Sequence, residues 1–223
     1  MYLIKTPFLL RAFYPSCVWR KPNNEKLIYL SFDDGPHPIA TPFVLAQLDK
    51  YNAKASFFCI GKNVVEYPAI YEQIITKGHT VGNHTQHHLN GWHTEDDLYL
   101  QNIQEASKVI STDFFRPPYG RIKRSQLKKI HANKSLPQQI IMWDVLSGDF
   151  DTKISGEACL NNVLRHTQAG SIVVFHDSAK AWDRLQVALP ATLEHFTQLG
   201  YQFRKKKKKI GQGRNLGRII RTL

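Results

Sequence analysis

The chain has 223 residues, of which 42% are hydrophobic and 22% are charged, a balance typical of a globular protein that buries a sizeable core. This composition excludes a disordered protein, and no stretch reaches the ~20 apolar residues of a membrane-spanning helix. Nine of the positive charges behind the net +12 lie in residues 204–223, and without them the chain carries +3. The body therefore gives no sign of specific nucleic-acid binding.

Residues 1–26 form an apolar N-terminal extension, which we expect to pack on the main domain. Charged residues and prolines interrupt it, so it lacks the continuous apolar stretch of a signal peptide. This pattern favours a protein of the cytoplasm or of a membrane periphery. The three cysteines form no CxxC pair and are expected to be buried thiols: Cys17, Cys59 and Cys159.

Short apolar runs alternate with segments of helical periodicity from residue 27 to residue 203. We expect strands at 27–32, 55–60, 79–82, 114–116, 139–143, 171–175 and 201–203. We expect helices at 41–52, 64–77, 95–111, 125–132, 156–167 and 182–199. The alternation predicts one α/β domain with a parallel sheet, either an open sheet or a closed barrel. Both place functional residues at the carboxyl ends of the strands.

Two adjacent carboxylates, Asp33 and Asp34, end the first predicted strand in the sequence SFDDGPHP. Adjacent anions repel each other, and a bound cation would relieve that repulsion. Without such a cation, the sequence DDGP is more often a simple turn. The pair therefore needs support from the rest of the chain.

Two histidines spaced four residues apart, His84 and His88, follow the third predicted strand in GNHTQHHLNGWH. This spacing places both on one face of a helical turn, although spacing alone leaves His87 as an alternative ligand. Imidazole nitrogens bind zinc, cobalt, nickel or iron. Two histidines and one carboxylate leave coordination positions open, as a catalytic metal site requires.

Three further polar clusters end later strands, in FRPPYG, MWDVLSGDFD and IVVFHD. Their candidate functional residues are Arg116, Asp149 and His176. Taken singly, these could be a surface cation, a turn residue and a core histidine. Their combination at successive strand ends is what indicates an active site.

In this order, SFDDGP, HTQHH, RPPYG, WDVLSGDF and VVFHD resemble the five motifs of the polysaccharide deacetylase family, also known by its NodB homology and as carbohydrate esterase family 4. The resemblance covers roughly residues 27–203 and leaves 204–223 as a basic C-terminal tail. It implies a distorted (β/α)7 barrel. Phe150, Val174 and Leu146 depart from residues common in the family, and the first two keep an apolar wall.

The resemblance also implies a role for each candidate residue. Asp33 would be the general base, and Asp34, His84 and His88 would bind a divalent metal, with zinc first and cobalt, nickel or iron as alternatives. His176 would be the general acid. The remaining roles fall to Arg116, which would hold Asp33, to Asp149, which would orient His176, and to Tyr119, whose backbone amide would face the oxyanion.

The function implied is removal of N-acetyl or O-acetyl groups from a glycan such as peptidoglycan or a chitin-like oligosaccharide. Three alternatives remain: hydrolysis of another non-peptide C–N bond by a deformylase or imidase, a non-catalytic carbohydrate-binding protein, and a polyanion-binding protein that acts through the tail. In the tail, Leu216, Ile219, Ile220 and Leu223 have helical spacing among basic residues, which would allow weak contact with an anionic membrane or another polyanion. The glycines there weaken any helix, and a solvated tail is the simpler interpretation.

Overall fold

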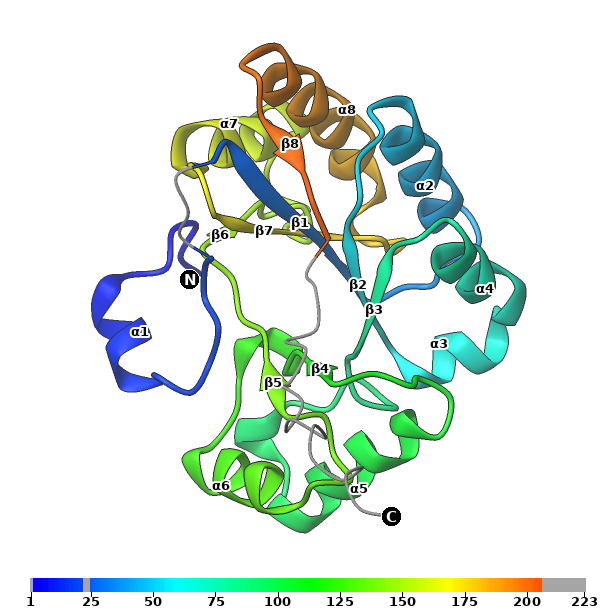
Figure 1. Cartoon of the computed structure of the whole chain (residues 1–223), viewed down its shortest axis with the longest axis vertical. Helices are drawn as coiled ribbons and strands as arrows, with labels where there is room; N and C mark the ends of the chain where they lie inside the picture. The colour runs from blue at the N-terminus through cyan, green and yellow to red at the C-terminus, as the bar shows by residue number, and fades with distance from the viewer. Residues whose placement is uncertain (1, 22–24, 206–223) are drawn as a thin grey trace, which may run out of the picture.

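A curled parallel sheet forms the centre of the computed structural model, which describes residues 2–21 and 25–205 (Figure 1). Its strands lie in the order β5-β4-β3-β2-β1-β7-β6, and β8 pairs with β1. Their bounds are β1 Leu27–Asp33, β2 Ser56–Cys59, β3 Thr80–Asn83, β4 Phe114–Phe115, β5 Gln139–Ile140, β6 Val145–Leu146, β7 Ile172–His176 and β8 Gln202–Phe203. The predicted distorted (β/α)7 barrel is thereby confirmed.

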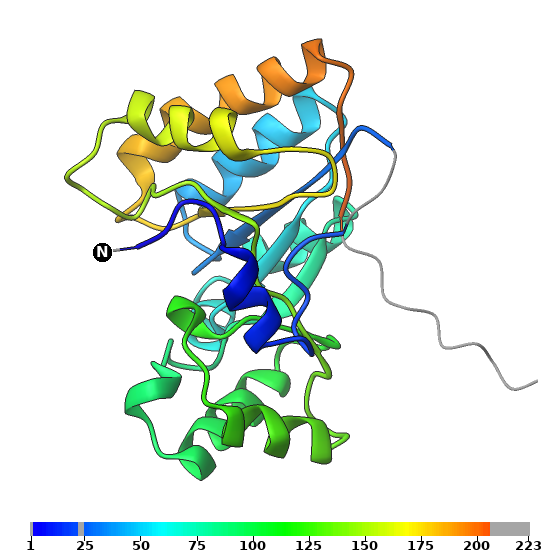
Figure 2. The same ribbon diagram turned by 90° about the vertical axis from the view of Figure 1, so that its left-hand side faces the viewer.

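Helices cover the outside of the sheet in two groups (Figures 1 and 2). One group contains α2, α7 and α8, the other contains α5 and α6, and the pair α3 and α4 lies between them in Figure 1. The helices are α1 Phe8–Phe13, α2 Ala40–Lys50, α3 Gly61–Glu66, α4 Pro68–Thr76, α5 Asp96–Ser107, α6 Arg124–Ala132, α7 Gly156–His166 and α8 Trp182–Gln198. Short 3-10 turns span Gly91–His93 and Pro118–Gly120. None of the described helices is both long and apolar enough to cross a membrane.

The apolar residues of β1 fix the position of the polar groups that follow them. Phe32 is fully buried, and its ring stacks on Phe57 of β2 at 5.1 Å and on Phe175 of β7 at 6.2 Å between centroids. The parallel register pairs Asp33 with Phe58 and with His176. A close-packed core is hardly compressible, so the carboxyl ends of these three strands are held rigidly together.

The N-terminal segment, residues 2–20, bridges the two ends of the curled sheet, β5 and β6. The backbone N–H of Thr6 donates to Asp144 at 3.0 Å, and that of Leu146 donates to Ile4 at 2.8 Å. Farther along, the N–H of Val18 donates to Ile140 at 2.8 Å. The segment therefore closes the seam of the barrel, and α1 lies between the two groups of helices in Figure 2.

The structure corrects several predicted elements. The helix predicted at 64–77 is two helices, because Pro68 starts α4 and the preceding Tyr67 has φ −125° and ψ 57°. The strand predicted at 139–143 ends at Ile140, and the separate strand β6 was not predicted. The three cysteines are free and buried, as predicted. The predicted helical spacing at 216–223 lies outside the described residues.

Candidate active site

One ligand atom each from Asp34, His84 and His88 lie within 4.8 Å of one another. Asp34 follows β1, and both histidines follow β3. The Oδ1 atom of Asp34 lies 3.1 Å from Nε2 of His88 and 3.6 Å from Nε2 of His84. The sheet therefore brings together the three side chains proposed as ligands from the sequence.

The two histidines do not share a helical turn, contrary to the expectation from their spacing. Thr85 and His88 have φ angles of 65° and 56°, in the left-handed region, so the loop turns sharply. The side-chain oxygen of Asn83 accepts the N–H of Thr85 at 2.8 Å, and that of Asn102 accepts the N–H of Gln86 at 3.0 Å. These bonds from β3 and α5 stabilise the loop in place of helical ones.

His87, left open as a ligand by its spacing, lies against α5 instead. The Nδ1 atom of His87 is 2.9 Å from the side-chain nitrogen of Asn102. The side-chain oxygen of Asn102 accepts the backbone N–H of His87 at 3.0 Å. His87 is absent from the cluster that could hold a metal. The geometry thus favours His88 over His87.

The protonation of His84 suits a metal ligand. Its Nδ1 lies 2.8 Å from the carbonyl oxygen of Arg116 and donates to it, which leaves the Nε2 lone pair facing Asp34. Burial lowers the pKa of His84 to about 4, so the ring is neutral at physiological pH. Burial alone would raise the pKa of Asp34, but the neighbouring His88 and the charge of His176 outweigh it and lower that pKa, so this carboxylate is ionised.

The donor set fits a divalent transition metal. Asp34 Oδ1 is buried and has no hydrogen-bond partner among the described residues, although two imidazole nitrogens face it. An ionised carboxylate oxygen without a partner is costly, and a shared cation would satisfy it. Two nitrogens and one oxygen are the kind of set that binds zinc and leaves positions free.

Asp34 also holds a backbone conformation that few side chains adopt, with φ 79°. Its carbonyl oxygen accepts a bond from the side chain of Asn63 at 2.7 Å. The following Gly35 is required sterically, because a Cβ there would lie 2.1 Å from the carboxylate of Asp177. Such strain persists only where surrounding contacts enforce it.

Asp33 lies beside this cluster and is held by Arg116. The Arg116 Nη1 atom donates to Asp33 Oδ1 at 2.5 Å and to Ser31 Oγ at 2.9 Å. Arg116 is fully buried and also donates to the carbonyl oxygens of Ile141 and Met142. A buried guanidinium bound on all sides keeps Asp33 in one orientation.

His176 lies next to Asp33 across the β1–β7 register and is held by Asp149. The His176 Nδ1 is 2.7 Å from Asp149 Oδ1, and its backbone N–H donates to Oδ2 at 2.7 Å. Burial alone would lower the pKa of His176, but the charge and hydrogen bond of Asp149 outweigh it and raise that pKa to about 10. His176 is therefore a cation at neutral pH.

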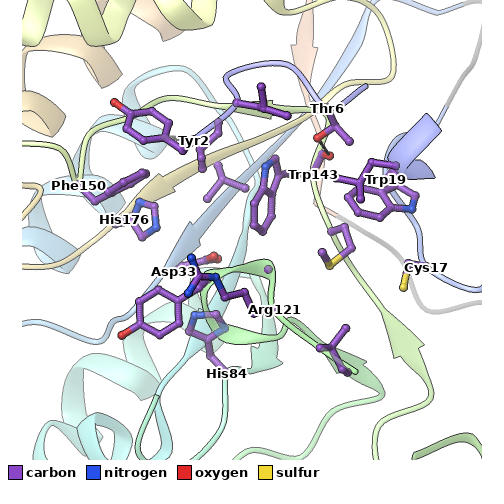
Figure 3. A pocket seen from close by; sticks show the side chains of 18 of the residues that line it. Tyr2, Thr6, Cys17, Trp19, Asp33, His84, Arg121, Trp143, Phe150 and His176 are labelled. Atoms are coloured by element: carbon purple, nitrogen blue, oxygen red, sulfur yellow. Dashed lines mark hydrogen bonds between the residues drawn. The ribbon is translucent and has the colours of Figure 1, made fainter. Parts of the chain in front are cut away.

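A cavity of about 820 Å³ joins these groups (Figure 3). Tyr119, in the turn Pro118–Gly120, lines it with φ 58°, and its hydroxyl lies 3.1 Å from Nδ1 of His88. Leu146 and Val174 line it as well, as does Phe150, whose ring packs edge-on against His176 at 5.3 Å. The predicted catalytic and metal residues thus all lie at or directly behind one cavity.

Asp177 contacts the loop of the site, and no role for it was predicted from the sequence. Its carboxyl group accepts the N–H of Gly35 at 3.2 Å and bonds the hydroxyl of Thr41 at 2.5 Å, which ties β7 to the loop that carries Asp34. Burial raises the pKa of Asp177 to about 8. Its position directly after His176, at the end of VVFHD, is the sequence feature from which a role could have been predicted.

Comparison with known proteins gives consistent relatives. Residues 20–135 match the family model described as polysaccharide deacetylase. A peptidoglycan-N-acetylglucosamine deacetylase of Bacillus cereus is 35% identical over 191 residues, which cover 83% of this chain and 88% of the relative. A chitooligosaccharide deacetylase of Azorhizobium caulinodans is 33% identical over 172 residues, which cover 72% of this chain and 80% of the relative.

Solved structures agree. The Bc1960 peptidoglycan N-acetylglucosamine deacetylase, crystallised with 4-naphthalen-1-yl-N-oxidanyl-benzamide, superposes with a TM-score of 0.78 at 30% identity, over 89% of this chain and 94% of that one. Fold, sequence and motif order therefore lead to one conclusion: the chain belongs to the polysaccharide deacetylase family of hydrolases.

Proposed function

We propose that the protein is a metal-dependent deacetylase that hydrolyses N-acetyl groups of a glycan built from amino sugars. The observation that carries this proposal is the pairing of an anion and a cation at adjacent strand ends. Asp33 is bound by Arg116, His176 is bound by Asp149, and the Asp34 cluster lies beside them. A carbohydrate-binding protein would have no use for this combination.

Amide hydrolysis requires a base for the water and an acid for the amine, because an unprotonated amine is a poor leaving group. Asp33 would accept the proton of the attacking water, held in position by Arg116. His176, cationic through Asp149, would donate its proton to the departing nitrogen. The products are acetate and a free amino sugar.

Asp34, His84 and His88 would hold the metal, for which zinc is our first choice and cobalt, nickel or iron the alternatives. A divalent metal supplies Lewis acidity that polarises the acetyl carbonyl. The backbone amide of Tyr119 would face the developing oxyanion. Tyr119 and His88 would restrain each other through their 3.1 Å contact.

Acetate release from defined substrates tests the proposal. We expect the zinc-loaded protein to release acetate from peptidoglycan or chitooligosaccharides, with one new amine for each acetate. Acetylated xylan serves as the O-acetyl comparison, and a formamido sugar tests the deformylase alternative. Formate release without acetate release, or binding without any product, would overturn the assignment.

The Asp149→Asn variant should lose activity with a shifted pH profile. The native pKa of His176, about 10, keeps the acid protonated through neutral pH. Without the carboxylate, burial lowers this pKa and only the charges of Asp34 and Asp33 still raise it, so less of the enzyme carries the proton at alkaline pH. We therefore expect the alkaline limb of the kcat/KM profile to move from near pH 10 to lower pH, by about 1–3 pH units.

Asp151→Asn is the matched control, because Asp151 lies two residues away and bonds Tyr2 instead of His176. Its profile should keep the native alkaline limb. An unchanged limb in Asp149→Asn would show that His176 does not supply the proton.

A further inference from the structure

Two turns at the cavity carry a tryptophan and an arginine that have no part in the proposed chemistry. Trp92 lies in the 3-10 turn Gly91–His93, and Arg121 directly follows the turn Pro118–Gly120. Both residues line the cavity that holds the catalytic groups, and Figure 3 shows the side chain of Arg121 among those that line it. Trp92 is 53% exposed, so its ring is not part of the packed core. This part of the cavity wall is therefore open to a ligand.

The two turns are fixed against each other. The backbone N–H of Trp92 donates to the side-chain oxygen of Asn90 at 3.1 Å, and its indole N–H donates to the carbonyl oxygen of Ile122 at 3.3 Å. A Cβ at Gly91 would lie 2.4 Å from the carbonyl oxygen of Arg121, so this close approach requires glycine. The ring of Trp92 and the backbone of Arg121 are thus positioned before any ligand binds.

Arg121 is a cation without an anionic partner in the described part of the chain. Its guanidinium carbon lies over the Trp92 ring, 5.2 Å from the centroid, and no residue among 2–21 and 25–205 accepts a bond from it. The ring stabilises the charge but offers no oxygen to the N–H donors. The carboxylates that line the cavity have other roles, because Asp33 is bound by Arg116 and Asp34 belongs to the cluster that could hold a metal.

A carboxylate is the ligand that suits this arrangement. A guanidinium presents paired N–H donors that match the two oxygens of a carboxylate, and the bonds are strengthened by charge. The exposed ring of Trp92 offers apolar surface to the C–H groups of a sugar. We propose that Arg121, held over Trp92, binds a carboxylate that the substrate carries near the amino sugar to be deacetylated. The inference rests on the proposed function and narrows its substrate class to acidic glycans.

The carboxylate could belong to a lactyl ether on the neighbouring sugar or to a short peptide attached there, and two substrate pairs distinguish these sources. The first pair is the disaccharide N-acetylglucosaminyl-N-acetylmuramic acid and its lactyl carboxamide. The second is the same disaccharide carrying an alanyl-glutamate dipeptide, as the free acid and as the diamide. We expect at least one acid to show about tenfold higher kcat/KM than its neutral counterpart, through a lower KM. About 0.5 M sodium chloride should reduce this preference by screening.

Variants locate the group that recognises the acid. Arg121→Gln should lose the preference for the acid, and Arg121→Lys should keep part of it, because lysine retains the charge without the planar donors. Arg124→Gln is the matched control and should keep the native preference, because Arg124 also lies over aromatic rings, those of Phe13 and Tyr14, but does not line the cavity. Lys180 lines the cavity as well, so a preference lost in Lys180→Gln but kept in Arg121→Gln would overturn the assignment.

Binding without turnover gives a second readout. In an Asp33→Asn background, calorimetric titration of the zinc-loaded protein with both substrate pairs should show about tenfold tighter binding of at least one acid, and adding Arg121→Gln should remove the difference. Equal affinity for acids and amides, or an acid preference that survives Arg121→Gln, would overturn the carboxylate site while acetate release by the native protein upholds the deacetylase. Acid-selective binding that depends on Arg121, with no acetate released from any substrate, would uphold the site and overturn the proposed function.

Discussion

Replacing Asp34 with alanine is expected to yield a folded protein that retains no stoichiometric metal and is nearly inactive. Asp34 is the only carboxylate of the cluster, and its Oδ1 faces the Nε2 atoms of His84 and His88 at 3.6 and 3.1 Å. Losing several kcal/mol of Lewis-acid stabilisation corresponds to a rate loss on the order of 10³-fold. Metal content by mass spectrometry and acetate release on the same sample measure both effects.

The backbone at this position calls for a second variant. Alanine is disfavoured at φ 79°, whereas asparagine tolerates that region, so Asp34→Asn keeps the loop and removes only the charge. His93→Ala serves as the control, because His93 follows the same loop and lies outside the cluster. If Asp34→Ala and Asp34→Asn both kept one metal per chain, the metal assignment would be wrong.

The sequence predicts the sheet and the strand-end positions of the site well, for a local reason. An apolar run such as that before Asp33 specifies a buried strand, and in a parallel sheet polar residues at its end face the active side. In contrast, the sequence could not decide whether His87 or His88 is the metal ligand. Their loop is shaped by Asn83 and Asn102, which lie in other elements, so spacing could not decide between the rings.

The structure of the N-terminal segment could not be predicted from the sequence either, because it depends on contacts with distant parts of the chain. Helix α1 has no buried residue and only six positions, too few for a periodic signal. Strand β6 has two residues. Both are stabilised by pairing distant parts of the chain, as where Leu146 donates to Ile4, and local patterns carry no information on such pairing.

Replacing Asp33 with asparagine should have the opposite signature to the Asp34 variants, with the metal retained and turnover lost. A proton-accepting group contributes about 10²- to 10⁴-fold to such a rate, and the amide cannot accept the proton. The amide oxygen can still accept the bond from Arg116, which keeps the geometry. A thermal unfolding curve is needed beside the kinetics, because Arg116 becomes a buried charge without an anionic partner.

Chemical rescue distinguishes a base from a merely structural carboxylate. In Asp33→Ala, added formate should restore part of the acetate release by acting as an external base, whereas chloride at equal ionic strength should not. The same formate should leave Asp34→Ala inactive, because that variant lacks the metal. Loss of metal in the Asp33 variants, or activity within tenfold of the native protein, would contradict the division of roles. Asp33 and Asp34 would then both support the metal site, and neither would be the general base that accepts the proton of the attacking water.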